Sequence, residues 1–211
     1  MIAIVDYGMG NLKSVSNALT MLNISNIVTS KEQEIADAQG IILPGVGAFP
    51  VCMENLKSLK LIEVIKYVAQ TKPFLGICLG LQLLFEESEE YGPVKGLGIF
   101  PGRVKRFPEG MVINNERLKI PHMGWSEIKK IKDTGFLNSI KDDSYFYFVH
   151  SYYVETEESL VATKTFYGID FISSITCKNL FACQFHPEKS QKLGLKLLQN
   201  FADMAESRKS S

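Results

Sequence analysis

The stretch that decides the fold of this chain is Phe74-Leu75-Gly76-Ile77-Cys78-Leu79-Gly80-Leu81-Gln82-Leu83-Leu84-Phe85. It begins after Pro73 as a short apolar run that is typical of a buried strand. From Leu79 to Glu87 it continues as a proline-free run that is compatible with a helix. Cys78 therefore lies at a predicted corner between a strand and a helix.

The glycines on either side of Cys78 indicate a reactive cysteine. Gly76 and Gly80 have no Cβ, so a strand and a helix can approach closely while the residue between them adopts a strained backbone, as in a nucleophile elbow. A helix that begins at Leu79 would also direct free N–H groups at the sulfur and favour the thiolate. The alternative is core packing, because a single cysteine in an apolar run is most often buried. A catalytic interpretation needs a base and an oxyanion site elsewhere.

Composition predicts one globular domain. Of the 211 residues, 45% are hydrophobic and 22% are charged, which favours a single domain over residues 1–206 with a disordered tail at 207–211. Lys+Arg and Asp+Glu balance at 23 each, so nucleic acid is not an expected partner. No apolar run approaches the roughly 18 residues of a membrane span, and the amino terminus lacks a basic signal segment. We expect a cytoplasmic protein without a membrane partner.

The cysteines and histidines do not have the spacing of a metal site. Cys52, Cys78, Cys177 and Cys183 form no CxxC pair, and without a secretion signal we expect free thiols. The three histidines are scattered and lack ligand spacing. The sequence predicts neither a metal nor a cofactor.

The first half of the chain alternates strands, loops and helices. Apolar runs predict strands at 2–5, 26–29 and 40–43, and Asn11 is a good N-cap for the helix that follows the first of them. The glycine-rich loop 6–11 matches no phosphate-binding motif, so a tight turn or a partner-contacting loop is favoured over a phosphate cradle. The loop 44–49 contains Gly45 and Gly47 at a strand end, where a main-chain N–H can face an oxyanion.

The second half is richer in turns and hairpin-like strands. Strands are expected around 117–120, 127–131, 160–164 and 172–177, with Pro121–Trp125 as an interruption. Residues 144–154 form an aromatic-rich run that predicts one further strand.

A second cluster of reactive groups follows the last predicted strand, Leu180–Phe185. This strand runs directly into His186-Pro187-Glu188. Residues two apart in an extended chain point the same way, so the Glu188 carboxylate is expected to approach the His186 imidazole and set its tautomer. A lone tripeptide of this kind is usually a turn. After a cysteine elbow, it supplies the base and the orienting acid that an activated thiol requires.

Together these motifs resemble those of a known family. Gly-Ile-Cys-Leu-Gly at 76–80 and His-Pro-Glu at 186–188 are similar to the motifs of the class I, or triad, glutamine amidotransferases. Within that family, the chain looks most like the glutaminase subunits of imidazole glycerol phosphate synthases, through Asp6–Asn11, Pro44–Phe49, Pro121–Trp125 and Gln184–Ser190. The resemblance implies an α/β fold of three layers, αβα, with a mostly parallel central sheet and additional antiparallel strands.

The resemblance also implies roles for individual residues. It makes Cys78 the nucleophile, His186 the general acid and base, and Glu188 the partner that orients His186. Three positions match substrate contacts, namely Gly47 and the backbone N–H of Leu79 in the oxyanion hole and Gln82 beside bound glutamine. The implied activity is hydrolysis of L-glutamine to glutamate and ammonia.

The implied partner is a cyclase subunit with a (β/α)8 barrel, bound as a heterodimer. In histidine biosynthesis it uses the ammonia to cleave a ribulosyl phosphate substrate into imidazole glycerol phosphate and an aminoimidazole carboxamide ribotide. The positions that match the subunit interface are Met9, Gly10, Asn11, Tyr147 and Lys189. Trp125 and the aromatic run add residues of the kind that anchor interfaces.

Two positions depart from the family pattern, because Ser126 follows Trp125 where Asn is common and Leu81 replaces a common Met. Neither belongs to the triad. The sequence of a glutaminase indicates its own reaction more clearly than it indicates which synthase uses the ammonia. A second interpretation is therefore a paralogue that supplies another synthase, such as a sugar-amidating enzyme. Two further interpretations are a stand-alone cysteine hydrolase and a binding module in which Cys78 is merely buried.

Overall fold

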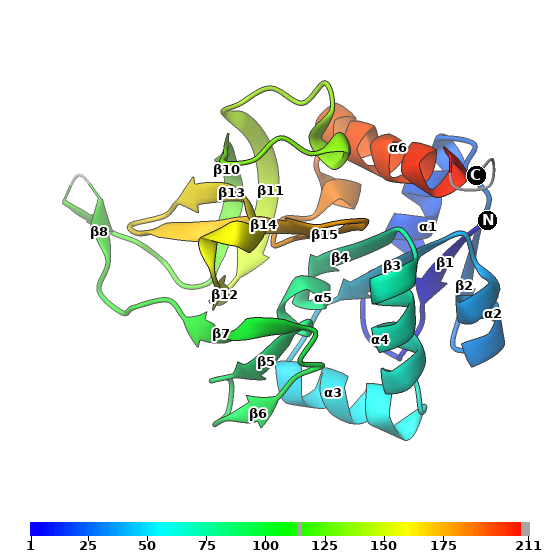
Figure 1. Ribbon diagram of the computed structural model, residues 1–211. Helices are drawn as coiled ribbons and strands as arrows, with labels where there is room; N and C mark the ends of the chain where they lie inside the picture. The colour runs from blue at the N-terminus through cyan, green and yellow to red at the C-terminus, as the bar shows by residue number, and fades with distance from the viewer. Residues whose placement is uncertain (114, 208–211) are drawn as a thin grey trace.

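The computed structural model describes residues 1–113 and 115–207 and is built around a parallel sheet (Figure 1). Five strands lie in the order β2-β1-β3-β4-β15. Their bounds are β1 (Ile2–Val5), β2 (Asn26–Thr29), β3 (Gly40–Gly45), β4 (Phe74–Cys78) and β15 (Leu180–Cys183). The strand that ends in Cys78 is therefore central, with β3 on one side and β15 on the other.

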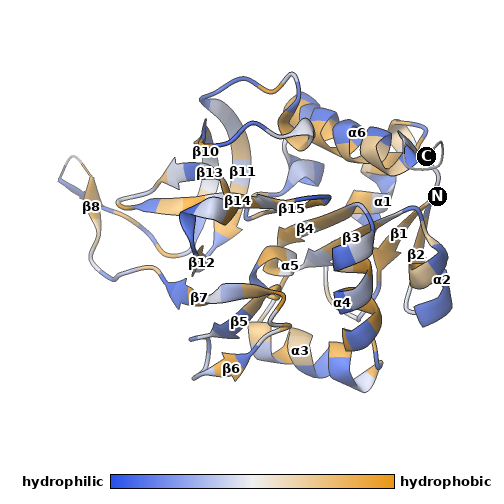
Figure 2. Ribbon diagram, in the orientation of Figure 1, coloured by the Kyte–Doolittle hydropathy of each residue, from blue (hydrophilic) through white to orange (hydrophobic). Residues whose placement is uncertain are grey.

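Helices cover both faces of this parallel sheet. One face packs against α2 (Glu32–Asp37), α3 (Phe49–Ser58) and α4 (Ile62–Thr71), and the other against α1 (Leu12–Met21) and α6 (Gln191–Ser207). Alternate residues of β1 separate the two cores, since Ala3 belongs to the first and Ile4 to the second, as the period of a strand requires. Figure 2 shows the apolar strands between these helices. The predicted three-layer α/β fold is confirmed.

Antiparallel strands extend the sheet beyond β15. The order continues through β14 (Asp170–Cys177), β12 (Tyr152–Glu155), β7 (Phe100–Arg106), β5 (Phe85–Ser88) and β6 (Val94–Lys95). A side branch contains β10 (His122–Lys130), β11 (Ser144–His150) and β13 (Val161–Phe166). The remaining elements are the hairpin of β8 (Val112–Ile113) and β9 (Glu116–Arg117) and the 3₁₀ turns η1 (Gly135–Leu137), η2 (Glu158–Leu160) and η3 (Pro187–Lys189).

The helix expected from Leu79 to Glu87 is much shorter than predicted. Helix α5 spans only Leu79–Gln82, and the chain enters β5 at Phe85. All residues from Leu79 to Phe85 are buried, so the run has no polar face to hold a surface helix. The Leu84 carbonyl instead accepts hydrogen bonds from the backbone N–H groups of Ile99 and Phe100. Tertiary pairing thus overrides the local helical pattern.

Two expectations for the second half were also wrong. His122–Trp125 does not interrupt the hairpins but lies within β10, where His122 pairs with His150 and Trp125 with Tyr147 of β11. The aromatic run 144–154 forms two strands rather than one, because β11 ends at His150 and β12 begins at Tyr152. The break brings Ser151 to the carboxyl edge of the parallel sheet, beside Cys78.

The carboxyl end of the described chain is helical. Ser207, which was expected to begin a disordered tail, is the last residue of α6, and residues 208–211 lie outside the described part. Within residues 1–113 and 115–207, no helix is long and apolar enough to cross a bilayer.

Gly80 generates a stability prediction. A Cβ at this position would lie 1.9 Å from the Leu43 carbonyl oxygen, a backbone atom that has no room to move. We expect Gly80→Ala to destabilise the fold by about 3 kcal/mol or more, the upper end of the cost of overpacking a core. Chemical denaturation monitored by circular dichroism measures it.

The matched control is Gly135→Ala, because a Cβ there would meet only the flexible Met204 side chain, at 3.5 Å from its sulfur and 4.0 Å from its terminal methyl group. This variant should stay within about 0.5 kcal/mol of the natural chain. Equal stability of the two variants would contradict the close approach at Gly80.

Candidate active site

The backbone at Cys78 has the strain expected of a nucleophile elbow. Its φ of 54° and ψ of −109° lie where residues with a side chain are rarely found. Cys78 is the last residue of β4 and the N-cap residue of α5. Because α5 has only four residues, the helix dipole contributes less to the sulfur than a long helix would.

His186 and Glu188 form a buried pair after β15. The His186 Nδ1 atom lies 2.8 Å from Glu188 Oε1, and both side chains are 1% exposed. The predicted contact is present, but the predicted extended geometry is not, because Pro187–Lys189 form the 3₁₀ turn η3. Pro187 suits the first position of such a turn because its φ is already restricted. The turn brings the carboxylate back toward the imidazole.

Cys78 and His186 line the same cavity, of about 280 Å³. Burial on its own would lower the pKa of His186, but the neighbouring Cys78 sulfur and the Glu188 carboxylate raise it to about 10. His186 Nε2 is buried, and no atom of the described chain is placed to form a hydrogen bond with it. The Cys78 sulfur is nevertheless close enough to the ring to raise the pKa of His186. The free nitrogen is the one that can exchange a proton with a ligand.

The residues matched to the oxyanion hole lie at this cavity. Gly47 and Leu79 both line it beside Cys78. Gly47 has a φ of +105°, and a Cβ on it would lie 2.4 Å from the Met9 side chain. The loops 6–11 and 44–49 therefore pack against each other next to the sulfur.

Gln82 also lines the cavity, but its amide nitrogen is already engaged. Nε2 donates to the Tyr152 carbonyl at 3.1 Å and to Gln184 Oε1 at 3.0 Å. A ligand beside Gln82 would therefore meet the amide oxygen rather than the nitrogen.

Other lining residues were not found from the sequence, and Glu90 is the most informative. It is the only carboxylate among those that line the cavity, and its Oε2 accepts a hydrogen bond from the Phe49 backbone N–H at 2.7 Å. Glu90 follows β5 in a turn without a motif, so its position depends on sheet pairing. Four more lining residues come from the β11–β12 break: Val149, His150, Ser151 and Tyr152.

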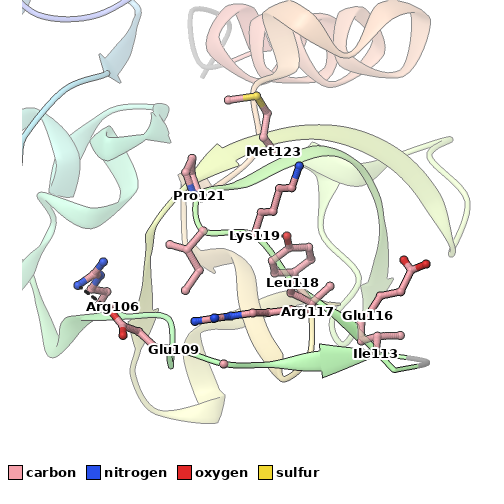
Figure 3. Close-up of a pocket in the computed structure, with 12 residues that line it drawn as sticks. Arg106, Glu109, Ile113, Glu116, Arg117, Leu118, Lys119, Pro121 and Met123 are labelled. Carbon is pink, nitrogen blue, oxygen red and sulfur yellow. Dashed lines mark hydrogen bonds and ion pairs between the residues drawn. The ribbon is translucent and has the colours of Figure 1, made fainter.

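A larger cavity, of about 1180 Å³, opens under the loop that precedes β10 (Figure 3). Among the described residues, it shares only Pro121 with the Cys78 cavity and is lined by neither cysteine nor histidine. We therefore place the chemistry in the smaller cavity.

The residues matched to a partner interface lie in two groups. In the first, the Lys189 ammonium sits 5.8 Å from the centre of the Tyr147 ring, and half-exposed Trp125 meets that ring edge-on at 6.0 Å. The second group is the loop with Met9, Gly10 and Asn11. Asn11 is the N-cap residue of α1, as expected, but its side chain makes no capping hydrogen bond. Helix α1 packs against η3, which connects the two groups.

The cysteines and acidic residues offer no sign of a metal centre. The four cysteines are free thiols, as expected. Among the residues that the structure describes, no group of three or more His, Cys, Asp and Glu side chains is arranged to hold a metal ion.

Comparison with known proteins matches nearly the whole chain. Residues 3–205 fit the family model described as glutamine amidotransferase class-I. The relative named imidazole glycerol phosphate synthase subunit HisH from Geobacter metallireducens is 47% identical, over 95% of this chain and 97% of that protein. The protein of the same name from Aquifex aeolicus is 51% identical, over 96% of each.

Solved structures show the same fold at lower sequence identity. PurLQS from Thermotoga maritima superimposes with a TM-score of 0.70 at 18% identity, over 96% of this chain and 97% of that chain. A glutamine amidotransferase structure reaches 0.73 at 16% identity, over 98% and 100%.

The histidine environments generate a pH prediction. Burial lowers the pKa of His122 to about 4 and that of His150 to about 3, whereas His186 is raised to about 10. We expect none of them to titrate near the usual value of about 6.5. Because the raised pKa belongs to the folded state, protonation of His186 stabilises the fold fully below about pH 6.5, and this contribution is lost as the pH rises through about 10.

Nuclear magnetic resonance of the imidazole signals tests this prediction. Glu188→Gln should lower the pKa of His186, because the carboxylate is one cause of its rise. Glu54→Gln, at an exposed position on α3, should leave it unchanged. A His186 signal that titrates near pH 6.5 in the natural chain would refute this account of the pair.

Proposed function

The chain belongs to the class-I glutamine amidotransferases, and we propose that it is the glutaminase subunit of an imidazole glycerol phosphate synthase. The observation that carries the proposal is that Cys78 and His186 line one cavity, with Glu188 bonded to the His186 ring at 2.8 Å, in a chain that matches the family from residue 3 to 205. Relatives that are 44–51% identical carry that enzyme's name, which favours it over a sugar-amidating paralogue.

In the proposed reaction, Cys78 and His186 divide the chemistry. The Cys78 thiolate attacks the carboxamide carbon of glutamine, and the carbonyl oxygen becomes an oxyanion. His186, held by Glu188, gives its proton to the departing ammonia. Water, deprotonated by the now neutral imidazole, then hydrolyses the glutamyl thioester, releasing glutamate and restoring the thiolate with protonated His186. Gly47 and the Leu79 N–H are proposed to bind the oxyanion.

Glu90 is proposed to hold the other end of glutamine. A free amino acid carries an ammonium, and in the described part of the chain Glu90 is the only carboxylate lining the cavity, so we assign the ammonium to Glu90. Gln82 is proposed to contact the substrate through its amide oxygen, because its nitrogen is occupied. The chemistry requires neither a metal nor a cofactor.

The proposed partner is the cyclase subunit, a (β/α)8 barrel that receives the ammonia and forms imidazole glycerol phosphate and the ribotide in histidine biosynthesis. We propose that it binds, in the cytoplasm, over Met9, Gly10, Asn11, Tyr147 and Lys189. Partly exposed Trp125 against Tyr147 provides aromatic area of the kind that anchors interfaces.

Loss of the nucleophile tests the activity. With the cyclase subunit of the same organism present, the natural chain should release glutamate from glutamine, and Cys78→Ser should reduce the rate by at least about a thousandfold, because a serine hydroxyl is not ionised at neutral pH. Cys177→Ser, at a half-buried thiol in β14, is the control and should retain activity. A fully active Cys78→Ser complex would exclude the proposed mechanism.

Loss of the interface residues tests the partner. Tyr147→Ala and Lys189→Ala should each weaken binding of the cyclase subunit by about tenfold, equivalent to about 1.4 kcal/mol. Isothermal titration calorimetry measures the dissociation constant. Tyr67→Ala removes a more exposed tyrosine from α4 and should leave it unchanged. Unaltered binding by both interface variants would place the partner on another surface.

A further inference from the structure

A chain of hydrogen bonds behind the cavity wall ends on the catalytic sulfur. The Tyr152 carbonyl accepts from His150 Nδ1 at 2.8 Å and from Gln82 Nε2 at 3.1 Å. Gln82 Nε2 also donates to Gln184 Oε1 at 3.0 Å, and Gln184 Nε2 lies 3.5 Å from Cys78 Sγ. The Gln82 and Gln184 side chains are buried, so each polar atom in this chain needs its partner.

One backbone carbonyl sets the orientation of both amides. The two ends of a glutamine amide look alike in shape, and only hydrogen bonding distinguishes them. The Tyr152 carbonyl can only accept, so Gln82 must turn its NH₂ group toward it. The second hydrogen of that group then requires an oxygen from Gln184. The NH₂ group of Gln184 is thereby left facing the sulfur.

The Tyr152 carbonyl also accepts a hydrogen bond from His150, which is in turn bonded to His122. Because His150 Nδ1 donates to this carbonyl, its Nε2 must accept, and it lies 3.0 Å from His122 Nδ1. His122 Nε2 in turn lies 2.9 Å from the Ser126 hydroxyl, which donates to it. Burial lowers the pKa of both rings, to about 4 for His122 and about 3 for His150. The rings stay neutral at physiological pH, and the direction of every donor is preserved.

From this geometry, and resting on the proposed function, we propose that Gln184 is a further catalytic residue. Its side-chain N–H donates to the Cys78 sulfur and stabilises the thiolate that attacks glutamine. Gln82 and the Tyr152 carbonyl hold it in that orientation. A hydrogen bond to an anion is stronger than one to a neutral thiol, so the bond favours the ionised form.

The amide differs from the titratable side chains that act on the sulfur. Four titratable side chains that interact with it are His186, Tyr7, Cys52 and Cys183. Burial raises the pKa of Tyr7, Cys52 and Cys183, so these three are neutral at physiological pH. His186 changes its charge during the reaction. Gln184 does not, so its hydrogen bond supports the sulfur anion in each step where the thiolate exists.

Alkylation of the full-length chain by iodoacetamide tests the proposal, with the Cys78 peptide followed by mass spectrometry over a range of pH. Gln184→Met removes the donor and keeps the length of the side chain. We expect alkylation at pH 7 to slow about tenfold and the pH of half-maximal alkylation to rise by about one unit, the effect of one hydrogen bond to a charged group. Glutamine hydrolysis with the cyclase subunit should lose about tenfold in kcat/KM.

The control and a second variant keep the test decisive. Gln33→Met removes an exposed amide that donates to Asp37 at 2.9 Å and should change neither measurement. Gln82→Met releases the Gln184 amide to rotate, so it should raise the pH of half-maximal alkylation in the same direction. It serves as the test if Gln184→Met does not fold.

An unchanged pH profile in a folded Gln184→Met chain, or in Gln82→Met if the former does not fold, overturns the proposal. Failure of the proposed function would look different. The natural chain with its cyclase subunit would then release no glutamate, while the alkylation profiles would still report on the sulfur.

Discussion

The structure depends on one close approach, between the first turn of α5 and the end of β3. Gly80 sits where a Cβ would be 1.9 Å from the Leu43 carbonyl oxygen, so only glycine allows the turn to rest there. Cys78 is still paired with Gly45 of β3, and α5 begins at the next residue, Leu79. The chain must therefore change direction at Cys78 itself. Cys78 accommodates this change with a φ of 54°. The cavity then forms at the carboxyl edge of the sheet, where ligands bind in open parallel α/β folds.

Around this corner, the site is assembled from polar groups that would be costly to bury alone. His186 has its charge partner in Glu188, and Gln184 and Gln82 satisfy one another. Two buried atoms of this pair have no hydrogen-bond partner in the described chain, Glu188 Oε2 and His186 Nε2, and His186 lines the cavity beside Cys78. Buried groups without partners are rare in proteins, and one beside a nucleophile marks the atom that the chemistry needs.

Sequence patterns predicted the structure correctly where it depends on residues close together in the chain. The glycines around Cys78 predicted the strained corner. The contact of His186 with Glu188 was also predicted, although the η3 turn makes it and not an extended chain. Sequence patterns gave the wrong prediction where the structure depends on pairing between strands that are far apart in the chain. The apolar run after Gln82 looks helical, but β5 forms because Phe85–Ser88 pairs with β7. Glu90 reaches the cavity because β5, which it follows, pairs with β7, and Tyr152 reaches it because β12 also pairs with β7. The direction of the Gln184 amide depends on a carbonyl 32 positions earlier, which no motif records.

The sequence by itself determined the layered α/β fold, the reactive corner and the imidazole–carboxylate pair, because strand periodicity, glycine at a tight turn and a proline between two functional groups act over a few residues. The tertiary structure decided how far α5 extends, where the aromatic run breaks, which carboxylate enters the cavity and which amide faces the sulfur. Those outcomes are set by hydrogen bonds between strands that are far apart in the chain, and the energy of each bond depends on partners that only the folded chain brings together.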